Sequence, residues 1–260
     1  MMHPAASALC GLMALITVPV PAHAADPAAA CPNPVYLTVD PATMDFAPRV
    51  VDILRRQQVK VTFWVSNQRT QNGEGSLGNL WGGWWKLVGQ QGHEFASQTY
   101  DHVYWRADLP GYKASFRIKP TTGAMAGREF TYDAARYCEQ IEHAARRMED
   151  FTGGKSLPVF HAPGGITSSK LLASARACGY AHVDIAKAGK LGKGASLQAA
   201  QAGVRSGDVL LLDLNAAPNA EPWAVANLEP LLVGLKERGM CFATLRQHPG
   251  LQDWISSRGG

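Results

Sequence analysis

The sequence contains few charged residues and lacks the signatures of nucleotide and serine-hydrolase chemistry. Asp, Glu, Lys and Arg make up 18% of the 260 residues, and the formal net charge is +4. This charge is too small and too dispersed to predict nucleic-acid binding, which uses clustered Lys and Arg. The chain also lacks the phosphate-binding G-x-x-x-x-G-K-[ST] pattern and the G-x-S-x-G turn of many serine hydrolases. We therefore expect neither of those enzyme classes.

The first 24 residues contain no Asp, Glu, Lys or Arg. An apolar stretch over residues 8–18 is followed by two prolines and then by Ala22-His23-Ala24. Small residues in this arrangement suit signal peptidase, so the pattern predicts a signal peptide cleaved after Ala24. The apolar stretch is too short for a stable membrane span. We expect an exported protein, periplasmic or secreted, with no membrane span after cleavage.

Four cysteines remain after the predicted cleavage, at Cys31, Cys138, Cys178 and Cys241. An even number in an oxidising compartment predicts two disulfides, and the sequence leaves all three pairings open. The chain has no C-x-x-C motif that would favour a zinc finger.

Short apolar segments alternate with segments of helical spacing through residues 25–260, which we expect to form a single domain. The predicted strands cover residues 35–39, 61–65, 93–96, 157–160, 181–185, 209–212 and 241–245. Helices are predicted over 48–58, 80–90 and 221–238, after Asp133 and after Thr167, where the last two residues suit N-caps. Repeated βα units predict a parallel sheet that forms a closed or nearly closed barrel. Residues 115–132 break this rhythm and predict an inserted hairpin.

Polar residues directly follow several of these strands. In a parallel barrel the carboxyl ends of the strands meet at one rim, where active residues gather. The sequence therefore predicts a polar pocket at this rim, formed by Asp40, Gln98, Thr99, Asp101, His102, His161 and Asp213.

Five segments, in order, resemble the NodB-type polysaccharide deacetylases of carbohydrate esterase family 4. They are L-T-V-D at 37–40 (family T-F-D-D), K-V-T-F-W-V at 60–65, G-H-E-F through T-Y-D-H at 92–102, F-H-A-P-G-G at 160–165 and G-D-V-L-L-L-D at 207–213. The resemblance implies a distorted (β/α)7 barrel. It also implies an enzyme that removes N-acyl, typically N-acetyl, groups from an amino-sugar polymer of the cell envelope or an exopolysaccharide.

The resemblance further implies a divalent, zinc-like metal, but this sequence departs from the ligand pattern. His102 matches the retained ligand. Pro41 and Gln98 occupy the positions of the family's Asp and first His ligands. A zinc site needs about three good protein ligands, and this sequence keeps one of the three in its expected position.

The resemblance assigns the catalytic roles in the same way. Asp40 matches the general base. His161 stands where the family has an Arg that orients the base, and Asp213 stands where it has the general-acid His. With His102, these side chains would form either a rearranged metal site or a metal-free acid–base pair.

The aromatic residues around His102 suit a saccharide ligand, because aromatic faces stack on the apolar faces of sugars. The predicted substrate-binding residues are Tyr100, Tyr104, Trp105, Pro163 and Gly164. Three hypotheses follow: an active hydrolase, an inactive carbohydrate-binding relative, and a scaffold protein that makes contacts through the inserted hairpin. The expected partner is a polysaccharide or oligosaccharide, and the oligomeric state stays open.

Overall fold

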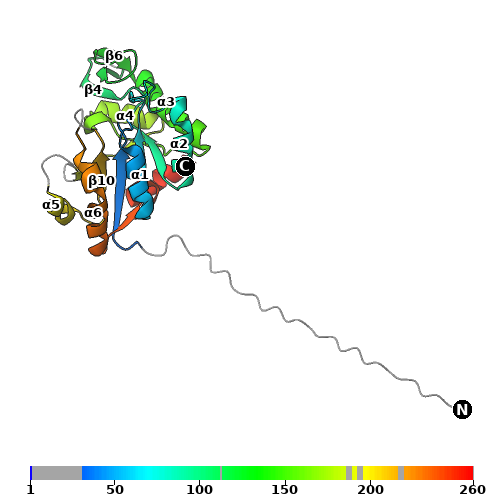
Figure 1. Cartoon of the computed structure of the whole chain (residues 1–260). Coiled ribbons are helices and arrows are strands. Elements are labelled where there is room, and N and C mark those ends of the chain that lie inside the picture. Colours follow the sequence, from blue (N-terminus) through cyan, green and yellow to red (C-terminus); the bar gives the residue numbers. More distant parts are fainter. Residues whose placement is uncertain (2–30, 112, 186–188, 192–195, 216–219, 260) are drawn as a thin grey trace. The chain divides into compact units, whose positions relative to one another are not determined.

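A computed structural model describes residues 1, 31–111, 113–185, 189–191, 196–215 and 220–259 (Figure 1). Residues 31–260 form one compact unit. The predicted cleavage site after Ala24 lies outside the described residues. Within the described part of the chain, no helix is long and apolar enough to cross a membrane.

A curled parallel sheet forms the centre of this unit. Its order is β8-β7-β3-β2-β1-β10-β9, and β11 pairs with the start of β1. The strands are β1 Pro34–Asp40, β2 Thr62–Val65, β3 Glu94–Ser97, β7 Val159–Phe160, β8 Ala181–His182, β9 Lys190–Leu191, β10 Val209–Asp213 and β11 Cys241–Ala243. Every pairing in this sheet is parallel. The predicted (β/α) barrel architecture is confirmed.

The helices are α1 Ala47–Arg56, α2 Asn79–Gln90, α3 Ala134–Thr152, α4 Ser169–Ala177, α5 Leu197–Gly203, α6 Trp223–Glu237 and α7 Pro249–Ser257. Helices α1 to α6 cover the outer face of this sheet (Figure 1). In α7, Ile255 instead packs in the cluster of inward side chains that includes Tyr36 and Trp64. The α3 N-cap is Asp133, as predicted, and its side chain accepts a hydrogen bond from Arg136 N. The predicted cap of α4 is wrong by one residue, because Ser168 rather than Thr167 accepts the bond from Leu171 N.

Alternation along the strands separates two layers of side chains. On β1, Val35, Leu37 and Val39 pack in the large apolar cluster that includes residues of α1, α2 and α6. Tyr36 lies in a second cluster with inward side chains of the neighbouring strands, including Trp64. Side chains along a strand point alternately to opposite faces, so Asp40 falls on the same face as Tyr36.

The same alternation places the other polar residues at the strand ends. Gln98 follows β3 in phase with Ala96, and His161 follows β7 in phase with Val159. Asp213 ends β10 in phase with Leu211. Ala96, Val159 and Leu211 belong to the inner cluster. The polar residues therefore continue the inner layer at the carboxyl ends of the strands.

An inserted antiparallel sheet interrupts the parallel one. It has three strands, β4 Val103–Asp108, β5 Ser115–Pro120 and β6 Phe130–Asp133. Phe116 and Ile118 on its inner face pack with residues of α3 and α4. The hairpin prediction over 115–132 is confirmed for β5 and β6 but misses β4. The pairing of β4 depends on contacts with β5 that the local pattern does not contain.

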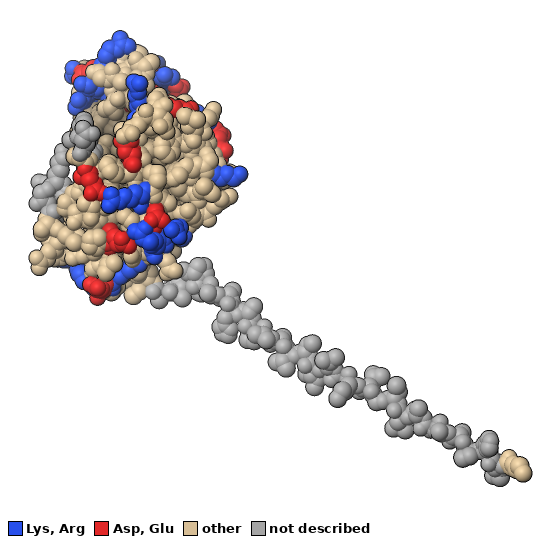
Figure 2. Space-filling model, in the orientation of Figure 1, with Lys and Arg blue, Asp and Glu red and all other residues tan. Residues whose placement is uncertain are grey.

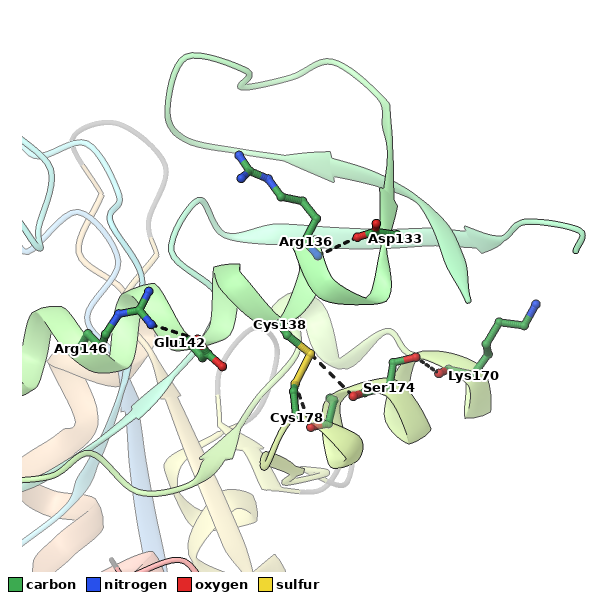
Figure 3. The surroundings of a disulfide bond; sticks show 9 residues. Asp133, Arg136, Cys138, Glu142, Arg146, Lys170, Ser174 and Cys178 are labelled. Atoms are coloured by element: carbon green, nitrogen blue, oxygen red, sulfur yellow. Dashed lines mark hydrogen bonds and ion pairs between the residues drawn. A yellow bond between two sulfur atoms is a disulfide. The ribbon is translucent and has the colours of Figure 1, made fainter. Parts of the chain in front are cut away.

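Two disulfides settle the pairing that the sequence left open. Cys31 pairs with Cys241, and Cys138 pairs with Cys178. The second bond joins α3 to the end of α4 (Figure 3). It therefore fixes the two helices that support the inserted sheet.

Candidate active site

Asp40 lies at the end of β1, directly opposite Asp213 in the register of β1 with β10. Its side chain is buried, with 5% of the residue surface exposed. Oδ1 accepts a hydrogen bond from Ala42 N at 3.0 Å, and Oδ2 accepts one from Gln98 Nε2 at 3.1 Å. Both carboxyl oxygens are thus held in place by groups of the protein.

Burial is the main cause of a raised pKa at Asp40, and the negative charge of Asp213 adds to it. The hydrogen bonds from Ala42 and Gln98 oppose the shift, and the resulting pKa is about 7. At neutral pH the carboxyl group is therefore present in both protonation states. A buried carboxyl group that titrates near neutrality suits general acid–base chemistry.

Gln98 contributes a buried acceptor that the protein leaves unused. The residue is 2% exposed, and its amide nitrogen is engaged by Asp40. Its Oε1 has no hydrogen-bond partner among the described residues. Leaving a buried acceptor without a partner costs about 1–3 kcal/mol. This oxygen favours a ligand that brings a hydroxyl or an amide N–H to the side of Asp40.

His102 lies at the end of a loop held in an unusual backbone conformation. His102 and Thr99 have φ values of 49° and 67°, in the left-handed region. Gln140 of α3 holds this loop, because it donates to Asp101 Oδ2 and accepts from Asp101 N. Ala42 and Met44, in the loop after β1, also have positive φ. Strained residues of this kind often cluster at functional sites.

The imidazole of His102 is neutral at physiological pH. Burial lowers its pKa to about 4, and the nearby His161 contributes in the same direction. Its Nδ1 lies 2.7 Å from Thr121 Oγ1, at the base of the inserted sheet. The ring is thereby fixed beside the site without carrying a charge.

His161 is almost completely buried, with 1% exposure. Its Nδ1 donates to the carbonyl oxygen of Val183 at 2.9 Å. The ring lies next to Trp64 and is nearly parallel to His182, at centroid distances of 5.5 Å and 5.6 Å. The backbone bond therefore fixes the orientation of the imidazole at the position where the resemblance implies an Arg.

Tyr104 is the predicted aromatic residue that the structure places at this site. Its ring meets His102 edge-on at 5.2 Å. Burial raises the pKa of Tyr104, and the charges of Asp40 and Asp213 raise it further. Gly164 has a φ of 70°, and a Cβ there would lie 2.9 Å from the Tyr104 ring. Gly164 thus lets the aromatic side chain approach the strand ends.

Tyr100 and Trp105 have other partners. Tyr100 stacks on His143 of α3, with 3.7 Å between ring centroids. Trp105 packs against the core of the inserted sheet and donates from Nε1 to Asp108. Pro163 is buried in the turn after β7. The structure therefore groups Tyr104 and Gly164 with the acidic pair, whereas the other three residues make structural contacts.

The donor set does not fit a resident zinc ion. Asp40 uses both oxygens in hydrogen bonds, Pro41 offers no donor, and Gln98 directs its amide nitrogen at Asp40. Across the described residues, no three His, Cys, Asp or Glu side chains are arranged to hold a metal. The rearranged metal site of His102, His161 and Asp213 is therefore not formed, and the mechanism below contains no metal step.

Two residues that hold the site were not predicted from the sequence. Thr121 contacts His102, and Gln140 holds Asp101. Thr121 lies inside the predicted hairpin over 115–132, directly after β5, which is a weak positional signal. Gln140 lies within a helix, and nothing in the local sequence distinguishes it from a solvent-facing residue.

Comparisons with known proteins agree with the fold. The profile of the family described as "Polysaccharide deacetylase" matches residues 28–183. No curated protein matches the chain.

Several solved structures share the fold. One is the Xyl-CE4 domain of a multidomain xylanase from the hindgut metagenome of Trinervitermes trinervoides, with a TM-score of 0.58, 18% identity and coverage of 87% of this chain and 91% of that one. A second is a family 4 acetyl xylan esterase from Clostridium thermocellum, in complex with a cobalt ion. Its TM-score is 0.58 and its identity 18%, and the match covers 86% of this chain and 91% of that one. A third is a CE4 family pseudoenzyme from Bacillus anthracis. Its TM-score is 0.56 and its identity 15%, and the match covers 83% of this chain and 65% of that one.

Proposed function

Because the chain belongs to the polysaccharide deacetylase family, we propose that it binds an N-acylated amino-sugar polymer at the rim of the barrel and hydrolyses the N-acyl amide. The observation that carries this proposal is the environment of Asp40. This buried carboxyl group has a pKa of about 7 and lies beside an unused acceptor on Gln98. We include export in the proposal, because the two disulfides are typical of proteins that fold in an oxidising compartment.

The proposed reaction needs one group that can both accept and return a proton. Ionised Asp40 takes a proton from water as the water oxygen bonds to the acyl carbon. The C–N bond then breaks, and the proton passes from Asp40 to the departing amine. The products are a free amino sugar and a carboxylic acid. A group whose pKa lies near the working pH is suited to both steps.

The other residues position the substrate in this scheme. Gln98 Oε1 accepts a hydrogen bond from the amide N–H or a neighbouring hydroxyl, which provides the partner that this buried oxygen lacks. Neutral His102 and the ring of Tyr104 form a wall of the site. Asp213 keeps the pKa of Asp40 high through its charge.

A second candidate is a carbohydrate-binding member of the family without hydrolytic activity. The observation in its favour is that the described residues contain no group of three metal-ligating side chains. Amide hydrolysis without a metal leaves less stabilisation for the charge that develops on the acyl oxygen. This candidate keeps the same binding site and the same contacts of Gln98 and Tyr104.

The two candidates are separated by acetate release and binding, measured on the mature protein after dialysis against a chelator. N-acetylglucosamine hexamer is the probe, Asp40→Asn is the test variant, and Asp253→Asn, at an exposed position of α7, is the control. Chelator-resistant release that Asp40→Asn abolishes and Asp253→Asn retains supports the hydrolase. Binding without release supports the second candidate. An absence of both binding and release refutes the two proposals together.

A further inference from the structure

The first two strands of the inserted sheet connect directly to residues of the candidate site. β4 begins at Val103, immediately after His102, and β5 ends at Pro120, immediately before Thr121. The contact between His102 and Thr121 therefore joins the start of β4 to the end of β5. A strand advances about 3.3 Å per residue, so Arg106, the fourth residue of β4, lies about 13 Å from His102. The outward face of this sheet thus extends away from Asp40 over a length that suits a polymer.

Three cations lie along this outward face, and we call Arg106, Arg117 and Lys119 the cationic face. Lys119 on β5 pairs directly with Tyr104 on β4. Arg117 lies two residues before Lys119 on β5, on the same face, and pairs with Ala107. A register shift between Trp105 and Ala107 places the extra residue Arg106 beside them. The Arg106 guanidinium lies 5.9 Å from the centre of the Tyr104 ring. Lys and Arg side chains gather at this end of the molecule in the surface view (Figure 2).

The charge on this face is only partly balanced. Arg106 and Arg117 share one carboxylate, Glu129, at 4.0 Å and 3.9 Å. Among the described residues, Lys119 forms no ion pair. Exposed ion pairs at such distances contribute little to folding, and the apolar packing of the insertion lies on its opposite face. These cations are therefore available to bind a negatively charged ligand.

We propose that the cationic face is a subsite for the carboxylate groups of an acidic polysaccharide, one that alternates or mixes uronic acids with N-acyl amino sugars. Guanidinium groups bind carboxylates in a planar, two-point geometry, and Tyr104 offers a ring on which a sugar face stacks. Tyr104 also connects the face to the candidate site, because its ring lies beside Arg106 and meets the ring of His102 edge-on at 5.2 Å. This inference rests on the proposed saccharide-binding function and adds the charge class of its substrate.

The test compares two hexasaccharides by calorimetry on the mature protein. Hyaluronan hexasaccharide contains N-acetylglucosamine and glucuronate, whereas N-acetylglucosamine hexamer is neutral. We expect the acidic probe to bind about tenfold more tightly at 50 mM NaCl, with the difference lost at 500 mM NaCl. Replacement of Arg106, Arg117 and Lys119 by Ser should remove the preference and leave binding of the neutral probe unchanged. The matched control replaces Arg55, Lys86 and Arg146, exposed on other elements, by Ser and should retain it.

The outcomes separate this inference from the proposed function. Equal binding of the two probes by the native protein overturns the cationic subsite and leaves saccharide binding intact. A preference that survives in the cationic-face variant also overturns it. Failure to bind either probe refutes the proposed function and the subsite together. Circular dichroism of both triple variants checks that their folds are unchanged.

Discussion

Replacement of Asp40 by Asn should stabilise the protein, and more so at alkaline than at acidic pH. The folded-state pKa of Asp40 is about 7, against 3.8 for an ordinary Asp. The folded state therefore binds the proton more tightly than the unfolded chain, so stability falls as the pH rises from about 4 to about 7. The change also suits Gln98, because its unpaired Oε1 can turn and accept from the new amide.

The size of this effect follows from proton linkage. Each pKa unit corresponds to about 1.4 kcal/mol, so ionised Asp40 costs about 4 kcal/mol of unfolding free energy above pH 7. At pH 5 the folded carboxyl group is mostly protonated, and the cost falls below about 2 kcal/mol. The advantage of Asp40→Asn over the native protein should therefore grow by about 2–3 kcal/mol between pH 5 and pH 8.

Urea denaturation of the oxidised protein at both pH values measures this difference. Asp253→Asn on α7 makes the same chemical change at an exposed position, where we expect an effect below about 0.5 kcal/mol at either pH. An Asp40→Asn effect that is independent of pH, or a variant less stable than native at pH 8, would refute the burial argument for Asp40.

Three further predictions concern activity, metal binding and the disulfide. Acetate release from N-acetylglucosamine hexamer should fall about tenfold per pH unit below pH 7, as Asp40 becomes protonated; a flat profile from pH 5 to 8 would remove Asp40 as the base. Pro41→Asp combined with Gln98→His should give a protein that retains one zinc ion through gel filtration, measured by elemental analysis against the native chain. If the double variant retains no zinc, the missing donors at these two positions are not what prevents zinc binding. Cys138→Ala combined with Cys178→Ala should lower the unfolding free energy by about 4 kcal/mol, because the bond closes a loop spanning 40 residues; an unchanged urea midpoint would contradict this.

The parallel sheet was predictable because its signals are local. Apart from Thr38, the run Val35–Val39 is apolar, as buried parallel strands are, and the helix after it begins near Pro48. The structure extends that strand only to Pro34 and Asp40. In contrast, Val103 is the one buried residue of β4, the other residues of the strand are half-buried or exposed, and the strand contains an internal bulge. This strand exists because β5 pairs with it. Pairing of this kind depends on distant residues, so the local pattern missed it.

The site was predictable in position but not in detail. Period-two alternation and strand ends place Asp40, Gln98, His161 and Asp213 on one rim. The sequence did not predict that Gln98 donates to Asp40 and leaves its own oxygen unpaired, because that depends on side-chain orientation. The stacking of Tyr100 on His143 was also missed, since it joins a loop to a helix distant in the sequence.

The bond between Cys31 and Cys241 turns most of the domain into a single covalent ring, because the two cysteines have a sequence separation of 210. One cut by a protease in any loop within that ring leaves the two fragments tethered, so the nicked molecule keeps its mass until a reductant is added. The fragments stay close at high effective concentration and can remain folded together. Wherever the protein meets proteases, this linkage would convert many backbone breaks into tolerated damage.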